Sequence, residues 1–167
     1  MSQEAYEYVG KGLGLLKEGL TSFVEMRLES NLSGHWRIEV SDRISSIKNF
    51  VEDGKILWDV QSLLMAMSFF WKDAFSDLKH PVRSYMGEIR VARNNHAHQQ
   101  NFTHEDADRA LDTMCRLLKE IDKKEANVKE IIYQFDTLRE EIKPITTEDD
   151  DSASPSHWKS YDLKVRR

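Results

Sequence analysis

Apolar side chains recur at steps of three and four positions near the start of the chain. The stripe that they form lies between about Gln3 and Leu28, and its members are Val9, Leu13, Leu16, Leu20, Phe23 and Arg27. A stripe with this period is one face of an amphipathic helix. We therefore expect a long first helix that packs along one side of the domain.

The same helical periodicity, weak in one segment and strong in the next, predicts two further helices. A short helix is expected around Ile44 to Val51, with Trp36 and Ile38 anchoring the preceding loop to the core. A second long helix is expected from about Ile56 to Leu78, and its broad apolar face puts it at the centre of the domain. The members of that face are Val60, Leu63, Leu64, Met67, Phe70, Trp71, Ala74 and Phe75.

Two further helices are marked by their start signals. Pro81 suits the first turn of a third helix, because its missing N–H is harmless there, and this helix should run toward His98. Thr103 and Asp106 have the spacing of a capping box with Asp in place of Glu. They predict the start of a fourth helix that extends to about Lys123.

The chain changes character after a fifth predicted helix, which runs from Val128 to a stop at Pro144. The stretch from Thr146 to Ser156 is rich in acidic residues and serine, so it cannot bury apolar surface and should be a disordered linker. We expect one folded domain over residues 1–145, followed over 146–167 by the acidic linker and a short peptide. From His157 onward this peptide regains aromatic and basic residues. It is either a docking peptide or the start of a further domain.

Glycines interrupt the first predicted helix at closely spaced positions. Gly10, Gly12 and Gly14 invite comparison with phosphate-binding loops, but no strand precedes them and no Gly-Lys-Ser or Gly-Lys-Thr follows. Small residues also let a neighbouring helix approach closely, and this is the interpretation that we adopt for these three and for Gly19.

The composition agrees with a helical protein. Hydrophobic residues make up 40% and charged residues 32% of the 167 residues, with 7 Gly and 3 Pro, which suits long amphipathic helices better than a turn-rich sheet protein. The predicted fold class is all-α, an up-and-down bundle of four to five helices. No apolar run has the length that crosses a membrane, and the start of the chain lacks a secretory signal pattern, so we expect a cytoplasmic protein without a membrane partner.

The cysteine content and the net charge narrow the chemistry. Cys115 is the single cysteine, which excludes an intrachain disulfide and a thiolate cluster for zinc. Because apolar residues surround it at helical spacing, we predict that Cys115 is a core residue. The net charge of -5 argues against a broad electrostatic grip on nucleic acid. An RNA substrate would need a local basic patch, for which Arg83, Arg90 and Arg93 are the candidates.

The third predicted helix carries polar residues on the side that faces away from the core. At about 100° per residue its apolar positions cluster around one direction, and these positions are Val82, Tyr85, Ile89, Ala92 and His96. Away from them runs a polar stripe of Arg83, Gly87, Arg90, Asn94 and His98. Because glycine weakens a helix but permits close approach of a second backbone, we expect this polar stripe to meet a partner.

The end of this helix resembles the signature of the HEPN ribonuclease superfamily, in which an arginine is followed a few residues later by a histidine at the end of a core helix. Arg93 and His98 have this arrangement, and the polar Asn94 directly follows the arginine. The flanking sequence is similar to the branch named after the yeast endonuclease of nuclear mRNA surveillance, and the likeness covers about residues 8–143. The runs that carry it are Asp59 to Trp71, Gly87 to Gln99 and Arg109 to Met114.

The resemblance implies endonucleolytic cleavage of RNA without a metal or a cofactor. In that reaction the ribose 2′-OH attacks its own phosphate and leaves a 2′,3′-cyclic phosphate and a 5′-OH. His98 suits the proton transfer, because an imidazole ordinarily titrates near neutral pH. Arg93 suits the stabilisation of the phosphorane oxygens, because its guanidinium is forked and permanently charged. Asn94 would orient the imidazole or the phosphate. The expected RNA contacts are Arg90, Arg83 and His96.

Two histidines compete for the catalytic role. In a continuous helix His96 is the nearer neighbour of Arg93, whereas His98 diverges from Arg93 by about 140°. We assign His98, as the family pattern does, since His96 shares the direction of the core residues. One helix is then poorly suited to close Arg93 and His98 around a single phosphate, so we expect two antiparallel copies to share one groove. The predicted interface residues are Gly87, Arg90 and Asn94.

The same resemblance leaves the wider role open. Bacterial members of this branch commonly form the start of larger ATPase or helicase proteins in defence loci, which implies a toxin or anti-phage effector with an ATPase, helicase or antitoxin partner. An alternative is a non-catalytic HEPN module that dimerises or binds RNA and regulates such a partner. A plain helical scaffold is the third hypothesis.

Overall fold

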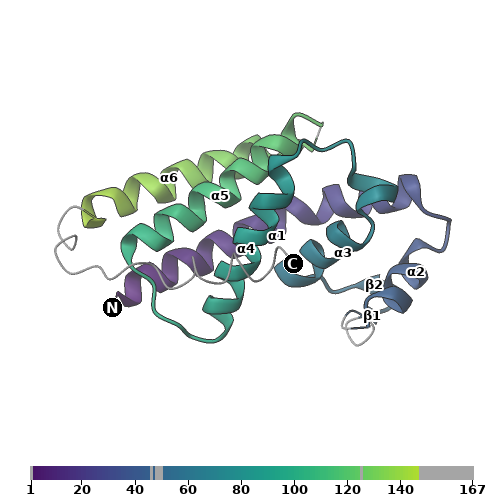
Figure 1. Ribbon diagram of the computed structural model, residues 1–167, viewed down its shortest axis with the longest axis horizontal. Helices are drawn as coiled ribbons and strands as arrows, with labels where there is room; N and C mark the ends of the chain where they lie inside the picture. Colours follow the sequence, from purple (N-terminus) through teal and green to yellow (C-terminus); the bar gives the residue numbers. More distant parts are fainter. Residues whose placement is uncertain (1, 46, 48–50, 125, 147–167) are drawn as a thin grey trace.

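The structure is a computed structural model that describes residues 2–45, 47, 51–124 and 126–146. Within these residues the chain is an up-and-down bundle of helices with one small two-stranded hairpin (Figure 1). The predicted all-α fold class is confirmed. A helix long and apolar enough for a bilayer is absent from the described residues. The predicted linker and the C-terminal peptide lie outside them.

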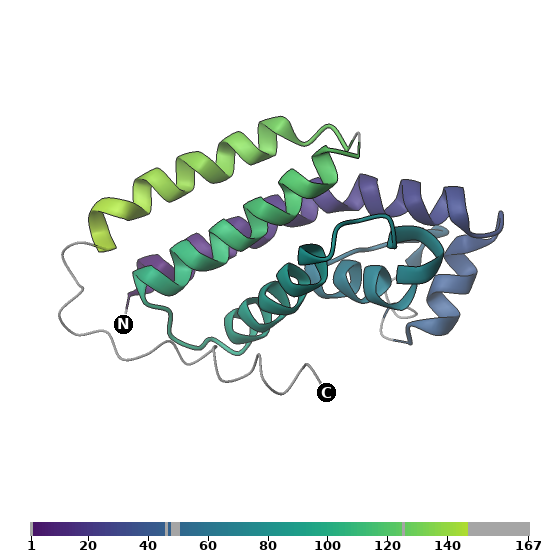
Figure 2. The same cartoon turned by 45° about the horizontal axis from the view of Figure 1, so that its top comes forward.

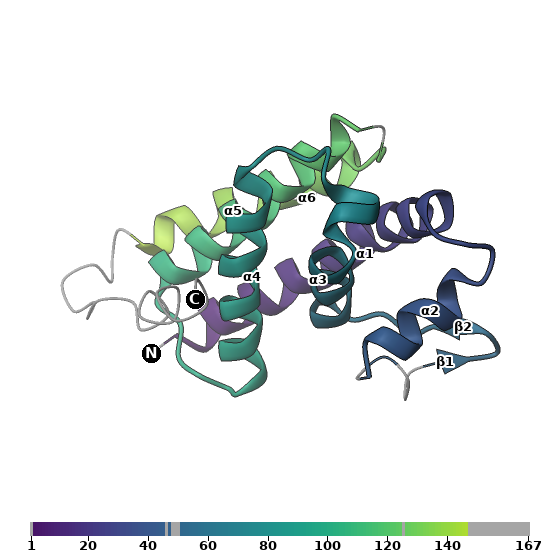
Figure 3. The ribbon, with the colours of Figure 1, turned by 45° about the vertical axis from the view of Figure 1, so that its right-hand side comes forward.

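Four helices form the body of the bundle. Helices α1 (Gln3–Asn31), α5 (His104–Asp122) and α6 (Lys129–Thr146) lie side by side along the long axis of the molecule (Figures 1 and 2). Helix α4 (Pro81–Ala97) packs on α5 and lies between α5 and the α3 region in the view of Figure 3. Among the described residues, the main neighbours of α4 are α5, α3 and α1.

Polar contacts show which helix ends meet. The Tyr8 hydroxyl donates to Glu141 Oε2 at 3.2 Å and so joins the start of α1 to the end of α6. Ser2 Oγ lies 3.0 Å from His104 Nε2, which joins the start of α1 to the start of α5. Helices α1 and α5 are therefore parallel, and α6 runs antiparallel to both.

Two glycines of α1 allow α5 to approach closely. A Cβ at Gly12 would lie 2.4 Å from Leu111 Cδ2, and one at Gly19 would lie 2.8 Å from Leu118 Cδ2. Both glycines lie within a continuous helix. The prediction that small residues serve helix packing is thus confirmed for Gly12 and Gly19 but wrong for Gly14, where an added Cβ would meet nothing within 4 Å, and the phosphate-loop alternative is excluded.

The second long helix is shorter than predicted, and its ends have local causes. Helix α3 (Val60–Phe69) begins after Asp59, which accepts from the Ser62 N–H at 2.7 Å in a capping box. After Phe70 the chain continues as a π-helical segment, η2 (Trp71–Phe75). The predicted apolar face is otherwise correct, since all its members are buried except Trp71, which is half-buried.

The prediction for the segment before α3 was wrong in its details. The short helix α2 (Trp36–Arg43) comes before the predicted segment, of which residues 46 and 48–50 lie outside the described residues. Trp36 is buried as predicted, but Ile38 is 61% exposed rather than anchored in the core. Strand β1 (Val51–Glu52) pairs with β2 (Lys55–Ile56). Between them Asp53 and Gly54 have φ values of 52° and 73°. An Asp-Gly pair with positive φ is the turn that two-residue hairpins prefer, and the helical interpretation overlooked it.

The last two helices follow their predicted signals. Thr103 accepts from the Asp106 N–H at 3.0 Å, and Asp106 accepts from the Thr103 N–H at 3.2 Å, so the predicted capping box is confirmed. Cys115 is buried in the core as expected. Helix α6 continues two residues past Pro144 instead of stopping there. The predicted helix end at Pro144 was therefore too early, and Thr146, the first residue of the predicted linker, belongs to α6.

Candidate functional site

Helix α4 presents the predicted site at its C-terminal end. The helix begins at Pro81 in its first turn and ends at Ala97, with His98 as the C-cap residue. Gln99 follows with a φ of 53°, a left-handed conformation that ends the helix. His98 therefore sits on the last turn of a helix that is anchored in the bundle.

The two sides of α4 differ as the sequence predicted. Val82, Ile89 and Ala92 are buried, and Tyr85 and His96 are half-buried against the core. On the polar stripe Arg83 and His98 are exposed, whereas Gly87, Arg90 and Asn94 are half-buried. A Cβ at Gly87 would meet nothing within 4 Å. Among the described residues, the polar stripe is thus open at its ends and partly accessible in its middle.

Arg93 lies at the junction of α4 and the start of α3. Its Nη1 donates to Asn94 Oδ1 at 3.3 Å, and its Nη2 lies 3.8 Å from Asp59 Oδ2. Since Asp59 also caps α3, one carboxylate serves both the helix start and the arginine. The Arg93 side chain is 27% exposed and that of Asp59 is 60% exposed, so the ion pair is open to solvent.

His96 packs against the start of α1. Its ring stacks on the Tyr6 ring with centroids 4.0 Å apart and planes at 10°, and the Phe102 ring lies tilted beside it at 6.4 Å. Burial lowers the pKa of His96 below its ordinary value of 6.5, and the positive charge of Arg93 adds to this, although hydrogen bonding to the Tyr6 backbone opposes it. The expectation that His96 points toward the core is confirmed.

His98 is exposed and joins its helix through the backbone. Its N–H donates to the Asn94 carbonyl at 3.0 Å. No hydrogen bond or ion pair links the side chains of Arg93 and His98 within the part of the chain that the structure describes. The structure brings Arg93 into contact with Asn94, while the exposed His98 follows on the same helix end.

Arg83 lies at the other end of α4. Its guanidinium lies over the Trp71 ring at 5.1 Å from the centroid. Fifteen residues separate Arg83 from His98, which is about 22 Å along a helix. If Arg83 contacts RNA, it therefore contacts a part of the RNA that lies far from Arg93 and His98.

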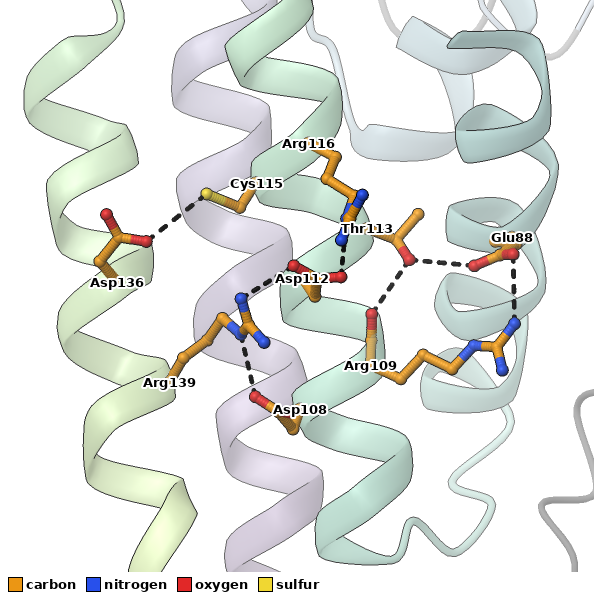
Figure 4. A network of polar contacts seen from close by, with 9 residues as sticks. All are labelled: Glu88, Asp108, Arg109, Asp112, Thr113, Cys115, Arg116, Asp136 and Arg139. Carbon is orange, nitrogen blue, oxygen red and sulfur yellow. Dashed lines mark hydrogen bonds and ion pairs between the residues drawn. The ribbon is translucent and has the colours of Figure 1, made fainter. Parts of the chain in front are cut away.

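The charge of α4 is positive on the accessible side. Glu88 is the one acidic residue in the helix, and it faces α5 (Figure 4). There it accepts from the Thr113 hydroxyl at 2.9 Å and from Arg109 Nη2 at 3.4 Å. Because this carboxylate is engaged by α5, the basic residues of the polar stripe are not neutralised by it.

The same view shows how α5 and α6 are joined. Arg139 of α6 donates from Nε to Asp108 at 2.9 Å and from Nη1 to Asp112 at 2.8 Å (Figure 4). These contacts and the bonds of Glu88 fix α4, α5 and α6 relative to one another. The helix that carries the site is thus joined to α5, and α5 to α6.

Two residues near the site were not predicted as part of it. Asp59 lies in a stretch that the resemblance covers, and its N-cap pattern with Ser62 could have been recognised, but nothing in the sequence shows that it faces Arg93. Tyr6 is 90 positions from His96, and no local pattern connects the two. Both contacts arise from packing between helices distant in sequence.

Comparison with known protein families identifies the class. Residues 11–122 match the family described as Swt1-like HEPN, which covers more than half of the chain. The chain therefore belongs to the Swt1-like HEPN family. No curated protein and no solved structure matches it. Among the described residues, no group of three or more His, Cys, Asp or Glu is arranged to hold a metal ion.

Proposed function

We propose that this HEPN domain is an endoribonuclease that cleaves RNA by attack of the ribose 2′-OH and needs no metal. The observation that supports this most directly is the arrangement at the end of α4. There an arginine and an asparagine in contact share a helix end with an exposed histidine, and all three belong to the family-matched region.

The residue types fit the chemistry step by step. A histidine side chain accepts the 2′-OH proton as the 2′ oxygen bonds to phosphorus, and the P–O5′ bond breaks as the 5′ oxygen gains a proton. Arg93 stabilises the negative charge that builds up on the phosphorane oxygens. In a shared groove His98 of one copy and the equivalent histidine of a second copy would act as base and acid.

Arg93 must exchange its contact with Asp59 for one with phosphate. The pair is 3.8 Å apart and open to solvent, and such pairs contribute about 0–1 kcal/mol. A forked, charge-assisted bond from guanidinium to phosphate is stronger. Substrate can therefore displace Asp59, which until then holds Arg93 in place.

The proposal is tested by incubating the full chain with total RNA in EDTA. We expect cleavage to products with 2′,3′-cyclic phosphate and 5′-OH ends, and loss of cleavage in Arg93→Ala and in His98→Ala. Arg43→Ala and His80→Ala are matched controls, since Arg43 is exposed on α2 and His80 is exposed at the opposite end of α4. Cleavage that persists in both site variants, or none by the wild type, would overturn the proposal.

The ion pair with Asp59 also favours a second candidate function. If Arg93 mainly joins α4 to α3, the domain is a non-catalytic HEPN module that dimerises or binds RNA and regulates an ATPase, helicase or antitoxin partner. Arg93→Ala would then lower the melting temperature, and the wild type would retain RNA in a gel shift without cleaving it.

For the catalytic form we propose the role of a toxin or defence effector. RNA cleavage inside a cell damages its own transcripts, so expression of the wild type is expected to arrest growth. His98→Ala should not arrest growth. Equal growth of the two strains at equal protein levels would contradict this role.

A further inference from the structure

The start of α1 forms a clasp over the end of α4. We use this name for Tyr6 and Gly10 of α1 with His96 of α4 and Phe102 of the loop that follows. The Tyr6 hydroxyl donates to the His96 carbonyl at 3.0 Å, and the two rings stack at 4.0 Å. The Phe102 ring lies 6.3 Å from that of Tyr6. Tyr6 and Gly10 precede the family-matched region.

The absence of a side chain at Gly10 permits this contact. A Cβ there would lie 2.9 Å from His96 Nε2 and 3.4 Å from His96 Cε1, and the first distance is shorter than real Cβ contacts. The imidazole therefore packs directly on the backbone of α1. The ring of His96 is held on one side by Tyr6 and along its edge by Gly10.

The hydrogen bond of Tyr6 acts on the backbone of α4, two residues before His98. The last four carbonyls of a helix lack partners within the helix, and the His96 carbonyl is one of them. It accepts from Tyr6 and also from the Gln99 N–H at 3.1 Å. Ala97 and His98 lie between His96 and Gln99, so His98 belongs to a turn that Tyr6 ties to α1.

We propose that Tyr6 is a positioning residue for His98, acting through the His96 carbonyl. This inference rests on the proposed function, because it assigns His98 the proton transfer. Without the hydroxyl one tether of the last turn is lost, and the exposed His98 imidazole samples a wider range of positions. Small displacements of a catalytic group can lower a rate by up to about a hundredfold.

Tyr6→Phe tests the proposal because it removes the hydroxyl and retains the ring stack. Tyr8→Phe is the matched control, since Tyr8 also loses one hydroxyl bond from α1, but to Glu141 of α6. We expect Tyr6→Phe to lower kcat on the order of tenfold with KM nearly unchanged. Tyr8→Phe should leave kcat within about twofold of the wild type. The melting temperatures of the two variants should be similar.

Amide hydrogen exchange supplies a readout that does not depend on cleavage. We expect the His98 and Gln99 amides to exchange faster in Tyr6→Phe than in Tyr8→Phe. Equal exchange in the two variants would overturn the positioning role, whatever the RNA assay shows. If the wild type does not cleave RNA, the proposed function fails and exchange alone decides whether Tyr6 orders this turn.

A second variant covers the case in which Tyr6→Phe misfolds. Gly10→Ala introduces the Cβ that would lie 2.9 Å from His96 Nε2 and so displaces the imidazole, and it too should speed exchange at His98. Gly14→Ala on the same helix is its control, because a Cβ there meets nothing within 4 Å. Unchanged exchange in Gly10→Ala would count against the clasp.

Discussion

At the scale of single residues, the two histidines of α4 have opposite surroundings although they are two positions apart. His96 is stacked on Tyr6 and half-buried, whereas His98 is exposed at the helix end. Burial disfavours the charged imidazole, so the pKa of His96 is lowered. This difference favours a structural role for His96 and leaves His98 accessible to a substrate.

The lowered pKa of His96 predicts how stability depends on pH. Between the folded pKa and the ordinary value of 6.5, the unfolded chain holds more protons on this residue than the folded chain does. Stability therefore falls as the pH drops below about 6.5, and the loss is complete below the folded pKa. His96→Phe keeps an aromatic ring on Tyr6 and cannot titrate, so it should lack this component.

The contribution of His96 to the pH dependence of stability is measured by urea unfolding of the wild type and His96→Phe at about pH 7.5 and about pH 5. The unfolding free energy of the variant should rise relative to that of the wild type as the pH falls, because all other titrations are shared. A difference that stays constant, or that moves the other way, would contradict the burial of a neutral His96.

At the scale of elements, helix α1 is fitted to its neighbours by glycine. Gly12 and Gly19 face α5 so closely that an added Cβ would force the Leu111 and Leu118 side chains to move, whereas Gly14 is open to solvent beside the groove between α1 and α6. Glycine lowers helix stability by about 1 kcal/mol relative to alanine. The same residue type is therefore needed at some positions of this helix and merely tolerated at others.

Alanine at Gly12 and at Gly14 should have opposite effects on stability. Gly14→Ala gains helix propensity without a clash and should raise the unfolding free energy by about 0.5–1 kcal/mol. Gly12→Ala places a Cβ 2.4 Å from Leu111 Cδ2, in a fully buried part of the core. Overpacking costs about 1–3 kcal/mol, so a net loss near 1 kcal/mol is expected. Urea midpoints that shift in the same direction for both variants would refute the close packing.

At the scale of the whole molecule, an acidic chain carries a basic helix face. The net charge is -5, yet the accessible side of α4 presents Arg90 and Arg83, and its one carboxylate is engaged by α5. We propose that two copies meet along this side, because a two-fold axis would double the positive charge and place two Arg93 and two His98 residues around one groove.

Gly87→Leu tests this assembly. A Cβ at Gly87 meets nothing within 4 Å in the single chain, so the variant should fold normally while its side chain obstructs a partner. The wild type should sediment at about twice 19.5 kDa and the variant as a monomer that no longer cleaves RNA. Gly14→Leu is the control, since a Cβ at Gly14 also meets nothing within 4 Å but the residue lies on α1. A wild-type monomer that cleaves RNA would exclude the shared groove.

The sequence alone determined the helical class, most helix positions and the orientation of α4. Helical periodicity and caps depend on residues three or four positions apart, which is why the Thr103 capping box and the buried direction of Val82 and Ile89 were predicted correctly. The errors are also local: the Asp53-Gly54 turn was overlooked, and the Asp59 cap makes α3 begin later than the predicted start at Ile56.

Only the tertiary structure decided what surrounds the candidate site. The contacts of Arg93 with Asp59 and of His96 with Tyr6 join residues 34 and 90 positions apart. Such pairs depend on how the helices pack, and a single sequence contains no periodic signal for them. The sequence thus predicted which side of α4 would be accessible. The packing of α1 and α3 against that helix decided how its catalytic candidates are held.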